Sequence, residues 1–338
     1  MNVLLTGGMG YIGSHTALAL LNDGHEVTIL DNLINSNISV LHSIKSISSI
    51  EPNFVQGDVL DTATLKDALQ KFDINSVIHF AGLKAVGESV LQPFMYYKNN
   101  IQGTISLIDA MLSCNIKTLV FSSSATVYGV PDYLPIDEKH PTNPNNPYGR
   151  TKFYIEQILT DIAHANKDWS IVNLRYFNPV GSHPSGLIGD LPNGIPNNLM
   201  PYINQVASEQ RPFLNIFGND YDTPDGTGIR DYIHVEDLSD AHLAALNWIN
   251  MPQKNTVPNI NNFNIGTGIG YSVREIIKTY ESVNGLKIPY KFTLRRNGDI
   301  AESYADAKKA NNILAWEALR SLEDMCYSAW NFQRANMP

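Results

Sequence analysis

Short apolar runs alternate with segments of helical periodicity through the first 180 residues. Runs of this length, bounded by glycine and polar residues, are typical of strands buried in a parallel sheet. They predict strands at residues 3–5, 26–30, 53–58, 76–82, 118–124 and 169–177. Helices are predicted at residues 61–72, at 88–114 with an interruption only at Pro93, and at 147–165. This alternation predicts an α/β fold with a doubly wound parallel sheet and right-handed crossovers.

The pattern becomes less regular beyond residue 180. Helices are predicted at residues 197–208, 235–249, 273–283, 306–314 and 322–332, and short strands at 214–217 and 262–265. These pieces are too small and too interleaved for an independent fold. The sequence therefore predicts a first domain at residues 1–180, to which some later segments return, and a smaller α/β cap formed mainly by residues 181–338.

A cluster of glycines joins the first strand to the first helix. Gly8, Gly10 and Gly13 form a Gly-x-Gly-x-x-Gly motif, and Gly7 starts an overlapping Gly-x-x-Gly-x-x-Gly. Glycine permits a tight turn, close approach of the backbone to a pyrophosphate, and close packing of the helix on the strand. The N–H groups at the start of the helix then favour phosphate. The alternative is an ordinary turn that binds nothing, which the strand before the motif and the helix after it disfavour.

An acidic residue ends the second predicted strand. Asp31 lies 18 residues after Gly13, where a carboxylate can accept hydrogen bonds from the hydroxyls of an adenosine ribose. That carboxylate would repel the additional phosphate of NADP, and the next residue is Asn32 rather than an arginine. The sequence therefore predicts NAD as the cofactor.

Tyr148 and Lys152 are spaced i, i+4 in the helix predicted at residues 147–165, so they share one face. A tyrosine with a pKa near 10 is a poor base at neutral pH, but a nearby ammonium or cationic nicotinamide favours the phenolate. Such pairs are common on helix surfaces, and this pair alone would indicate no function. The strand that ends at Ser122 and Ser124 changes the interpretation, because strand carboxyl ends face the ligand crevice in this architecture. The Ser124 hydroxyl can pass a proton between a substrate and Tyr148.

The composition of the chain argues against nucleic-acid-binding and membrane-spanning proteins. Of the 338 residues 43% are hydrophobic and 17% charged, which is typical of a globular chain with about two domains. The net charge of −9 argues against a broad nucleic-acid-binding surface. No apolar run has the length of a membrane span, and no signal segment precedes the first strand. We therefore expect a soluble, cytoplasmic protein with no nucleic-acid or membrane partner.

The residues that commonly bind metals are dispersed. Cys114 and Cys326 are too few and too far apart for a disulfide framework or a metal cage. The nine histidines form no cluster with ligand spacing. We therefore predict no metal site and interpret His15, His79 and His234 as structural residues.

The motifs together carry a resemblance to a known family. The turn at residues 6–13, the strand before Ser124 and the Tyr148-x-x-x-Lys152 pair resemble the extended short-chain dehydrogenase/reductase family. Within it, the chain resembles the UDP-glucose (UDP-galactose) 4-epimerases over essentially its whole length. The most specific matching segments are residues 79–89, 122–129, 175–181, 194–201, 216–221, 225–235 and 295–299. The resemblance implies a Rossmann domain that binds NAD and a cap that binds a UDP-sugar.

The resemblance also implies a mechanism. Tyr148 would take the proton of the sugar 4-hydroxyl while C4 gives hydride to NAD, with Ser124 bridging the proton transfer. Lys152 would lower the pKa of Tyr148 and hold the nicotinamide ribose. The 4-keto sugar would turn about its diphosphate and take the hydride back on its other face. NAD is unchanged over a cycle, so it can stay bound.

Further binding residues are implied by the same resemblance. Residues implied to contact NAD are Gly7, Gly10, Tyr11, Ile12, Gly13, Asp31, Asn32, Asn35, Ser36, Asp58, Val59, Phe80, Ala81, Gly82, Lys84, Asn99, Ser122, Tyr148, Lys152, Tyr176 and Phe177. Residues implied to contact the UDP-sugar are Lys84, Ser124, Tyr148, Asn178, Asn198, Leu199, Asn215, Ile216, Phe217, Arg230, Arg296, Asp299 and Ser303. Arg230 and Arg296 would clamp the diphosphate, because guanidinium groups suit oxyanions. Surface salt bridges are the alternative role for either arginine.

Three positions refine the substrate and the reaction. Related sugar-nucleotide 4,6-dehydratases carry an Asp-Glu pair where this chain has Ala125 and Thr126, so a dehydration is disfavoured. Four residues after Asp299 stands Ser303, where some relatives have a tyrosine that crowds the 2-position of the sugar. We expect the smaller side chain to admit UDP-GlcNAc and UDP-GalNAc as well, although Tyr304 could refill part of the space.

Other functions and assemblies are left open at this point. The enzyme could be specialised for UDP-GlcNAc, or the chain could be a non-catalytic NAD sensor on the same fold. A third alternative is a dehydrogenase with net redox turnover. By analogy with relatives, the helices predicted at residues 88–114 and 147–165 would pair with those of a second copy in a four-helix bundle, giving a homodimer.

Overall fold

The computed structural model describes residues 1–192, 194, 196, 198–251, 259–296 and 298–337. Asn197, the predicted first residue of one helix, lies outside these ranges. No helix in the described ranges is long and apolar enough to cross a membrane.

Seven parallel strands form the central sheet, which confirms the predicted doubly wound α/β fold. In order across the sheet they are β10 (Ile260–Ile265), β6 (Ser170–Tyr176), β5 (Thr118–Ser122), β4 (Ser76–His79), β1 (Asn2–Thr6), β2 (Glu26–Asp31) and β3 (Asn53–Gln56). From β1 the chain builds outward to β3 and then returns to β4 on the other side. The strand order therefore reverses between β1 and β4, the position at which such sheets bind ligands beyond their carboxyl ends.

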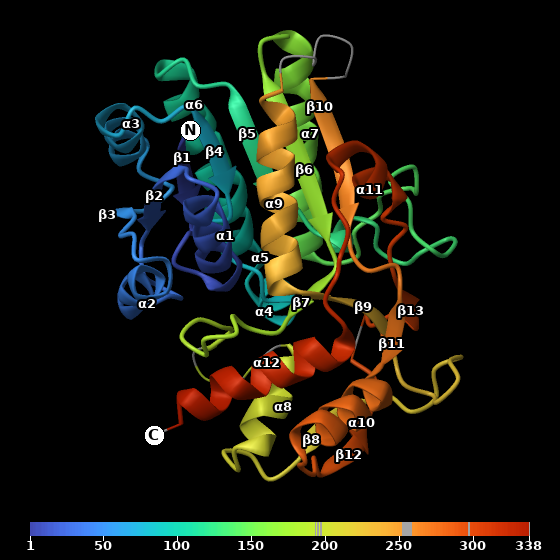
Figure 1. Ribbon diagram of the computed structural model, residues 1–338. Coiled ribbons are helices and arrows are strands. Elements are labelled where there is room, and N and C mark those ends of the chain that lie inside the picture. Colours follow the sequence, from blue (N-terminus) through green and yellow to red (C-terminus); the bar gives the residue numbers. More distant parts are fainter. Residues whose placement is uncertain (193, 195, 197, 252–258, 297, 338) are drawn as a thin grey trace.

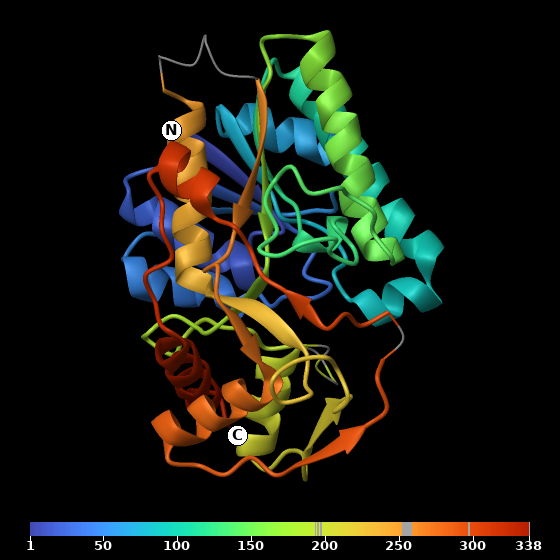
Figure 2. The same ribbon diagram turned by 90° about the vertical axis from the view of Figure 1, so that its right-hand side faces the viewer.

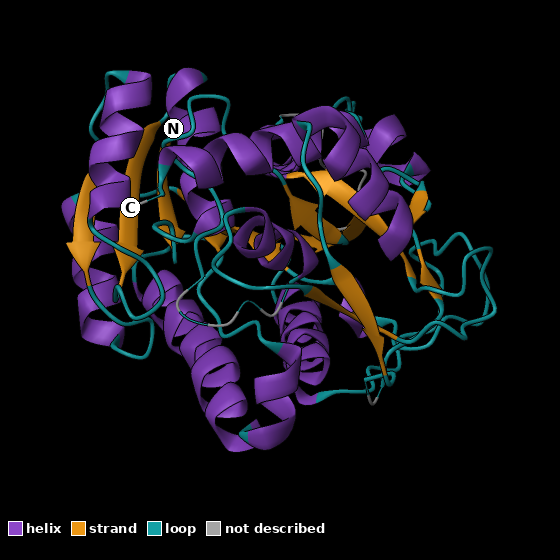
Figure 3. Cartoon of the chain, turned by 90° about the horizontal axis from the view of Figure 1, so that it is seen from below, coloured by secondary structure: helices purple, strands orange, loops and turns teal. Residues whose placement is uncertain are grey.

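Helices cover both faces of this sheet (Figures 2 and 3). On one face lie α1 (Tyr11–Asn22), α2 (Ser39–Ser48) and α9 (Val235–Ile249), which share an apolar core with the strands. On the other lie α3 (Thr62–Lys71), α6 (Gly103–Ser113) and α7 (Pro147–Ala165), with a second apolar core. Burial of each amphipathic helix against the sheet supplies most of the stability of such helices.

The helical pattern predicted at residues 88–114, interrupted only at Pro93, is confirmed in its extent and in the place of its break, but it includes a π-helix that was not predicted. The segment comprises α4 (Val86–Leu91), α5 (Pro93–Tyr96), a π-helix (Tyr97–Gln102) and α6. Gln92 leaves the helical region with φ −131° and ψ 56°, as expected before a proline. From the π-helix the Asn100 amide binds the backbone of Leu83, accepting from its N–H at 2.8 Å and donating to its carbonyl at 3.0 Å. The irregular turns thus fix the loop after β4.

Except for α11, the remaining elements lie beyond the carboxyl ends of the central strands (Figure 1). The helices are α8 (Leu199–Ala207), α10 (Val273–Asn284), α11 (Lys308–Leu314) and α12 (Leu322–Ala335), of which α11 packs beside β10. The strands are β7 (Asn178–Val180), β8 (Leu214–Phe217), β9 (Ile229–His234), β11 (Gly270–Ser272), β12 (Tyr290–Thr293) and β13 (Glu302–Ser303). β9 pairs with β7, β11 and β13, and β12 pairs with β8. The domain boundary at residue 180 stays a prediction.

Candidate active site

Tyr148, Lys152 and Ser124 converge at the carboxyl end of β5. Asn146 caps α7 by accepting from the Gly149 N–H at 2.8 Å, which places Tyr148 in the first turn. The Lys152 ammonium donates to the Ser122 carbonyl at 2.7 Å and lies 6.0 Å from the centroid of the Tyr148 ring. Ser124 directly precedes a short 3₁₀ turn (Ala125–Val127), and its hydroxyl lies close enough to Tyr148 to lower the pKa of that phenol. The structure therefore brings the three predicted catalytic residues together.

Burial dominates the ionisation of this group. It raises the pKa of Tyr148 well above the usual value, Tyr176 adds to the rise, and the Ser124 hydroxyl opposes it. Burial also lowers the pKa of Lys152 to about 8, an effect that the Glu156 carboxylate opposes. Lys152 is therefore mainly cationic at neutral pH. A further positive charge beside Tyr148 would be needed to form the phenolate there.

The glycine turn packs so closely on neighbouring backbone that it has no room for side chains at two positions. Gly7 has φ +70°, and a Cβ on it would lie 2.7 Å from the Ala81 backbone nitrogen. A Cβ on Gly13 would lie 2.6 Å from the Gly7 carbonyl oxygen. Gly10 precedes α1 without a side-chain cap, and the first turn, which begins with Tyr11 and Ile12, has no acidic residue. These N–H groups suit an anion.

Asp31 is held at the end of β2 by hydrogen bonds to both carboxylate oxygens. It accepts from the Met9 N–H at 3.0 Å, the Leu33 N–H at 2.9 Å and the Ser36 hydroxyl at 2.8 Å. Beside it, the Asn32 amide donates to Asp58 at 2.9 Å. The structure thus brings Asp31, Asn32, Ser36 and Asp58 together, with Asn35 exposed in the same loop and Val59 buried after Asp58.

The other residues implied to contact NAD follow the ends of β4 and β6. Phe80, Ala81 and Gly82 come directly after β4, and Tyr176 and Phe177 lie at the end of β6. The exposed Lys84 has its ammonium 3.9 Å from Asp190 and 5.8 Å from the centroid of the Tyr11 ring. In the π-helix, Asn99 donates to Asn100 at 3.0 Å. The Ser122 hydroxyl donates to Tyr176 at 3.3 Å.

The two arginines proposed for the diphosphate lie near each other but in different environments. Arg296 forms an ion pair with Asp299 at 2.8 Å and stacks on Phe217, 4.9 Å from the ring centroid. Arg230 donates to the carbonyls of residues 229 and 300 at 2.7 and 2.9 Å, and more weakly to that of residue 301. Its Nε–H has no acceptor in the described part of the chain and remains available to a ligand.

The other residues predicted to bind the substrate lie on, or directly before, short strands and a helix beyond the central sheet. Asn178 begins β7, Asn198 precedes α8 with Leu199 in its first turn, and Asn215 and Ile216 lie on β8. Ser303 pairs with Arg230 where β13 meets β9. The Asn215 side-chain oxygen is buried without a partner in the described residues, so a ligand N–H or O–H could satisfy it. Asn145, just before α7, donates to the Gly298 carbonyl at 3.2 Å and links this region to the Tyr148 helix.

Sequence reasoning missed Glu156 and Arg175, which lie behind the catalytic group. Their side chains form a buried ion pair at 2.6 Å. The available signal was the position of Glu156, four residues after Lys152 on the same helix face. Arg175 lies in residues 175–181, one of the segments that resemble the family, but no role was predicted for it. In the described chain no group of three or more His, Cys, Asp or Glu residues could hold a metal ion.

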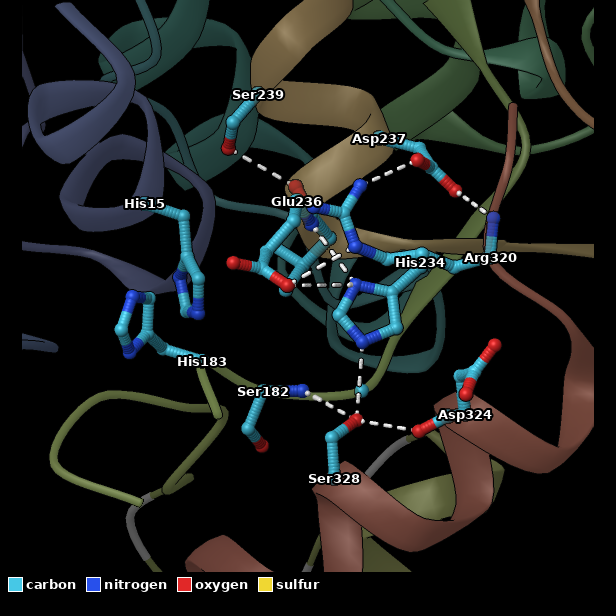
Figure 4. Close-up of polar contacts among 12 residues, drawn as sticks. His15, Ser182, His183, His234, Glu236, Asp237, Ser239, Arg320, Asp324 and Ser328 are labelled. Carbon is cyan, nitrogen blue, oxygen red and sulfur yellow. Dashed lines mark hydrogen bonds and ion pairs between the residues drawn. The ribbon is translucent and has the colours of Figure 1, made fainter. Parts of the chain in front are cut away.

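A polar joint connects the α9 side of the sheet with α12 (Figure 4). The His234 ring caps α9 by accepting from the Glu236 N–H at 3.1 Å, so its other nitrogen donates to Ser328 at 3.0 Å. The Ser328 oxygen also accepts from the Ser182 N–H at 3.2 Å. Above it, Arg320 binds Glu236, Asp237 and Asp240. His234 and Asp237 are buried, and together these contacts fasten the start of α9 to the segment that leads into α12.

The comparisons with known proteins agree with this geometry. Residues 3–266 match the model of the NAD dependent epimerase/dehydratase family. The chain belongs to this family. A relative named UDP-glucose 4-epimerase, from Bacillus subtilis (strain 168), is 52% identical over 337 residues that cover 100% of this chain and 98% of the relative.

Two solved structures are also close to this chain. One is a UDP-glucose-4-epimerase from Stenotrophomonas maltophila with bound NAD and formylated UDP-arabinopyranose. It has a TM-score of 0.96 and 49% identity, with coverage of 99% of this chain and 98% of that one. The other, a UDP-glucose 4-epimerase from Bifidobacterium longum in complex with NAD+ and UDP, has a TM-score of 0.95, 48% identity and coverage of 99% of both chains.

Proposed function

We propose that this protein is an NAD-dependent 4-epimerase that interconverts UDP-glucose and UDP-galactose through a transient 4-keto sugar. The observation that carries the proposal is the meeting of Tyr148, Lys152 and Ser124 at the carboxyl edge of the sheet in which β1 leads into the glycine turn. A strand-end hydroxyl, a buried tyrosine and a lysine are the groups that an alcohol oxidation requires for its proton. The similarity to UDP-glucose 4-epimerases over the whole chain supports the same reaction.

The residues fit NAD. Gly7 and Gly13 have no room for a Cβ, so the turn is tight and the start of α1 packs closely on it. This turn would bring the uncapped N–H groups at the start of α1 to a pyrophosphate. Asp31 would hold the adenosine ribose, and Lys152 the nicotinamide ribose. When bound, NAD would accept and return the hydride of the sugar C4.

The protein's own groups would move the proton. Tyr148 would accept the proton of the sugar 4-hydroxyl through the neighbouring Ser124 hydroxyl, which lowers the pKa of Tyr148. The Lys152 ammonium would favour the phenolate. When the sugar has turned, Tyr148 would return the proton to the same oxygen. Arg230 and Arg296 would bind the diphosphate. Because the substrate would then be held mainly through its diphosphate, the hexose ring would be free to turn.

The test is turnover of UDP-glucose by the purified protein without added NAD. The wild type is expected to form UDP-galactose with no net NADH. Tyr148→Phe is expected to lose activity by about 10²–10⁴-fold, the usual contribution of a general acid–base group, with its NAD content retained. Released NADH would instead indicate a dehydrogenase. Bound NAD without turnover of any UDP-hexose would indicate a sensor.

We further propose that Ser303 lets the enzyme accept UDP-GlcNAc and UDP-GalNAc. The Tyr304 ring packs against Gly270, where an added Cβ would lie 3.1 Å from it. Consecutive strand residues point to opposite faces, so Tyr304 does not refill the space at Ser303. Ser303→Tyr is expected to abolish turnover of UDP-GlcNAc and retain that of UDP-glucose. Equal loss on both substrates would contradict this assignment.

A homodimer through α4–α7 is also proposed. Leu91 and Phe94 are 82% and 79% exposed, and Ile105, Leu112 and Tyr154 add further exposed apolar surface on these helices. Apolar groups gathered in this way favour a protein partner, and a second copy satisfies them symmetrically. Leu91→Lys/Phe94→Lys is expected to yield a monomer in size-exclusion chromatography with light scattering, while Leu294→Lys, at another exposed leucine, should remain dimeric.

The two free cysteines support a reducing, cytoplasmic location. The net charge of −9 supports function without a nucleic-acid partner. Fractionation of cells that produce the protein would test the location directly.

A further inference from the structure

The Glu156 carboxylate lies one helical turn beyond Lys152 and connects α7 to two strands. It is 1% exposed. One oxygen accepts from the Ser123 hydroxyl at 2.5 Å and from Arg175 Nε at 2.9 Å, and the other accepts from Arg175 Nη2 at 2.6 Å. Ser123 follows β5 and Arg175 belongs to β6. A single carboxylate therefore links the catalytic helix to both strands that flank the site.

The partners of Glu156 are themselves fixed. Arg175 donates to the Tyr128 hydroxyl at 3.1 Å, and Tyr128 donates to the Asn264 side-chain oxygen on β10 at 2.6 Å. The buried charges are thus paired and hydrogen-bonded, which offsets the cost of removing them from water. Replacing such a pair with apolar residues is often tolerated, so stability alone does not require this arrangement.

The contact with Ser123 lies between two residues of the catalytic group. The carbonyl of Ser122 accepts from the Lys152 ammonium at 2.7 Å. The hydroxyl of Ser124 lies close enough to Tyr148 to lower its pKa. Because Glu156 fixes Ser123 relative to α7, it also sets the position of both neighbours relative to Lys152 and Tyr148. A shift between strand and helix would lengthen both contacts together.

We propose that Glu156 is a positioning residue for the Tyr148–Lys152–Ser124 group, holding α7 in register with β5 through Ser123 and with β6 through Arg175. The proposal rests on the 4-epimerase function proposed above. Glu156 acts through these neighbours and does not contact the reacting atoms.

Glu156 also contributes charge to the site. Apart from each other, Lys152 and Tyr148 have five titratable or charged groups around them among the residues that the structure describes: His79, Tyr96, Glu156, Arg175 and Tyr176. Glu156 is the group that raises the pKa of Lys152 against the effect of burial. His79 stays neutral in the assay range, because burial lowers its pKa to about 3. Loss of Glu156 would thus remove the Lys152 charge at a lower pH and leave Tyr148 harder to ionise.

The experiment compares three variants with the wild type, using the protein as purified. Glu156→Gln removes the charge and retains the shape. Glu156→Leu/Arg175→Met removes both charges and retains most of the volume. Asp237→Asn is the matched control, because Asp237 is also a buried carboxylate bound to an arginine, Arg320, but belongs to the joint in Figure 4. The readouts are thermal stability, the pH dependence of kcat, and the pKa of Lys152 from the NMR signal of its ε-carbon, assigned with Lys152→Arg.

Glu156→Gln is expected to lower the pKa of Lys152 by about one unit, the scale of an adjacent opposite charge. The alkaline limb of the kcat profile is expected to move down by a similar amount. Glu156→Leu/Arg175→Met should be more stable than Glu156→Gln, while the shift of the Lys152 pKa and the shift of the alkaline limb of kcat persist. If Glu156→Gln does not fold, this double variant alone tests the proposal. The control should lose stability without either shift.

A double variant with wild-type stability and a wild-type pH profile would overturn the proposal and leave a purely structural pair. A control that shows the same shifts would also overturn it, since general destabilisation would then suffice. If the wild type turns over no UDP-hexose, the proposed function fails, and the Lys152 pKa still tests the positioning.

Discussion

Acidification should destabilise this protein steeply below pH 6.5, because four histidines are buried in their neutral form. His15, His79, His234 and His242 are each 2% exposed or less. Burial lowers the pKa of the first three to about 3 and that of His242 to about 4. Their neutral rings are built into the structure: His79, for example, lies between the hydroxyls of Thr6 and Thr104 at 2.6 and 2.9 Å.

The sign and size of the effect follow from these pKa values. Such a histidine has a pKa of about 3 in the folded protein and about 6.5 in the unfolded chain. Between these two pH values it is protonated mainly in the unfolded chain, so the stability of the protein falls as the pH falls. At pH 5.5 each such group lowers the free energy of unfolding by about 1.4 kcal/mol, or about 5–6 kcal/mol for all four. Carboxyls whose pKa burial raises, such as Asp231, act in the opposite direction at lower pH. The window from pH 7.5 to 5.5 isolates the histidines best.

The assay is urea unfolding at several pH values in this window, followed by the fluorescence of the four tryptophans. His242→Gln should reduce the loss of stability by about a quarter, because one of four equivalent groups is removed. His42→Gln is the control, since His42 is exposed on α2. Equal stability at pH 7.5 and 5.5 would refute the reasoning, as would a His242→Gln variant with the pH dependence of the wild type.

Three further substitutions test other parts of the structure. Gly13→Ala should reduce the NAD retained on purification at least about ten-fold, because its Cβ would lie 2.6 Å from the Gly7 carbonyl; unchanged NAD content would contradict the proposed phosphate turn. Ser328→Ala should lower the free energy of unfolding by about 2–4 kcal/mol, since the Ser182 and His234 N–H donors lose their acceptor; a change within about 0.5 kcal/mol would mean that water replaces the hydroxyl. Asp231→Asn should lower the free energy of unfolding, measured in thermal or urea unfolding, by a similar amount of about 2–4 kcal/mol. Both Asp231 oxygens accept hydrogen bonds from backbone N–H groups, those of Thr267, Gly268 and Ala305, and an asparagine NH₂ cannot accept them.

Some structure was missed because short segments carry little local signal. β7, β9, β11, β12 and β13 were not predicted. β9 contains Arg230 and Asp231, and its pairing partners lie in three separate segments of the chain. Its hydrogen-bond partners decide its conformation more than its own sequence does. The π-helix was missed for a similar reason, because its wide turns serve contacts of Asn100 with Leu83 and Thr151.

The sequence by itself determined the features that depend on neighbouring residues. The strands of the first 180 residues follow from apolar runs, the glycine turn from the need for backbone space, and the shared face of Tyr148 and Lys152 from helical spacing. The extent of α7 was predicted at both ends, and Pro147 is a local signal for its start.

Only the tertiary structure decided which distant groups meet. It placed β10 beside β6, paired Glu156 with Arg175, and gave Arg230 backbone carbonyls of residues 300 and 301 as partners. It also left the histidines neutral by burying them. These outcomes depend on burial and on hydrogen bonds between segments far apart in the chain, for which spacing along the sequence carries no signal. The catalytic group was therefore predictable from the sequence, while the contacts that hold it in place were not.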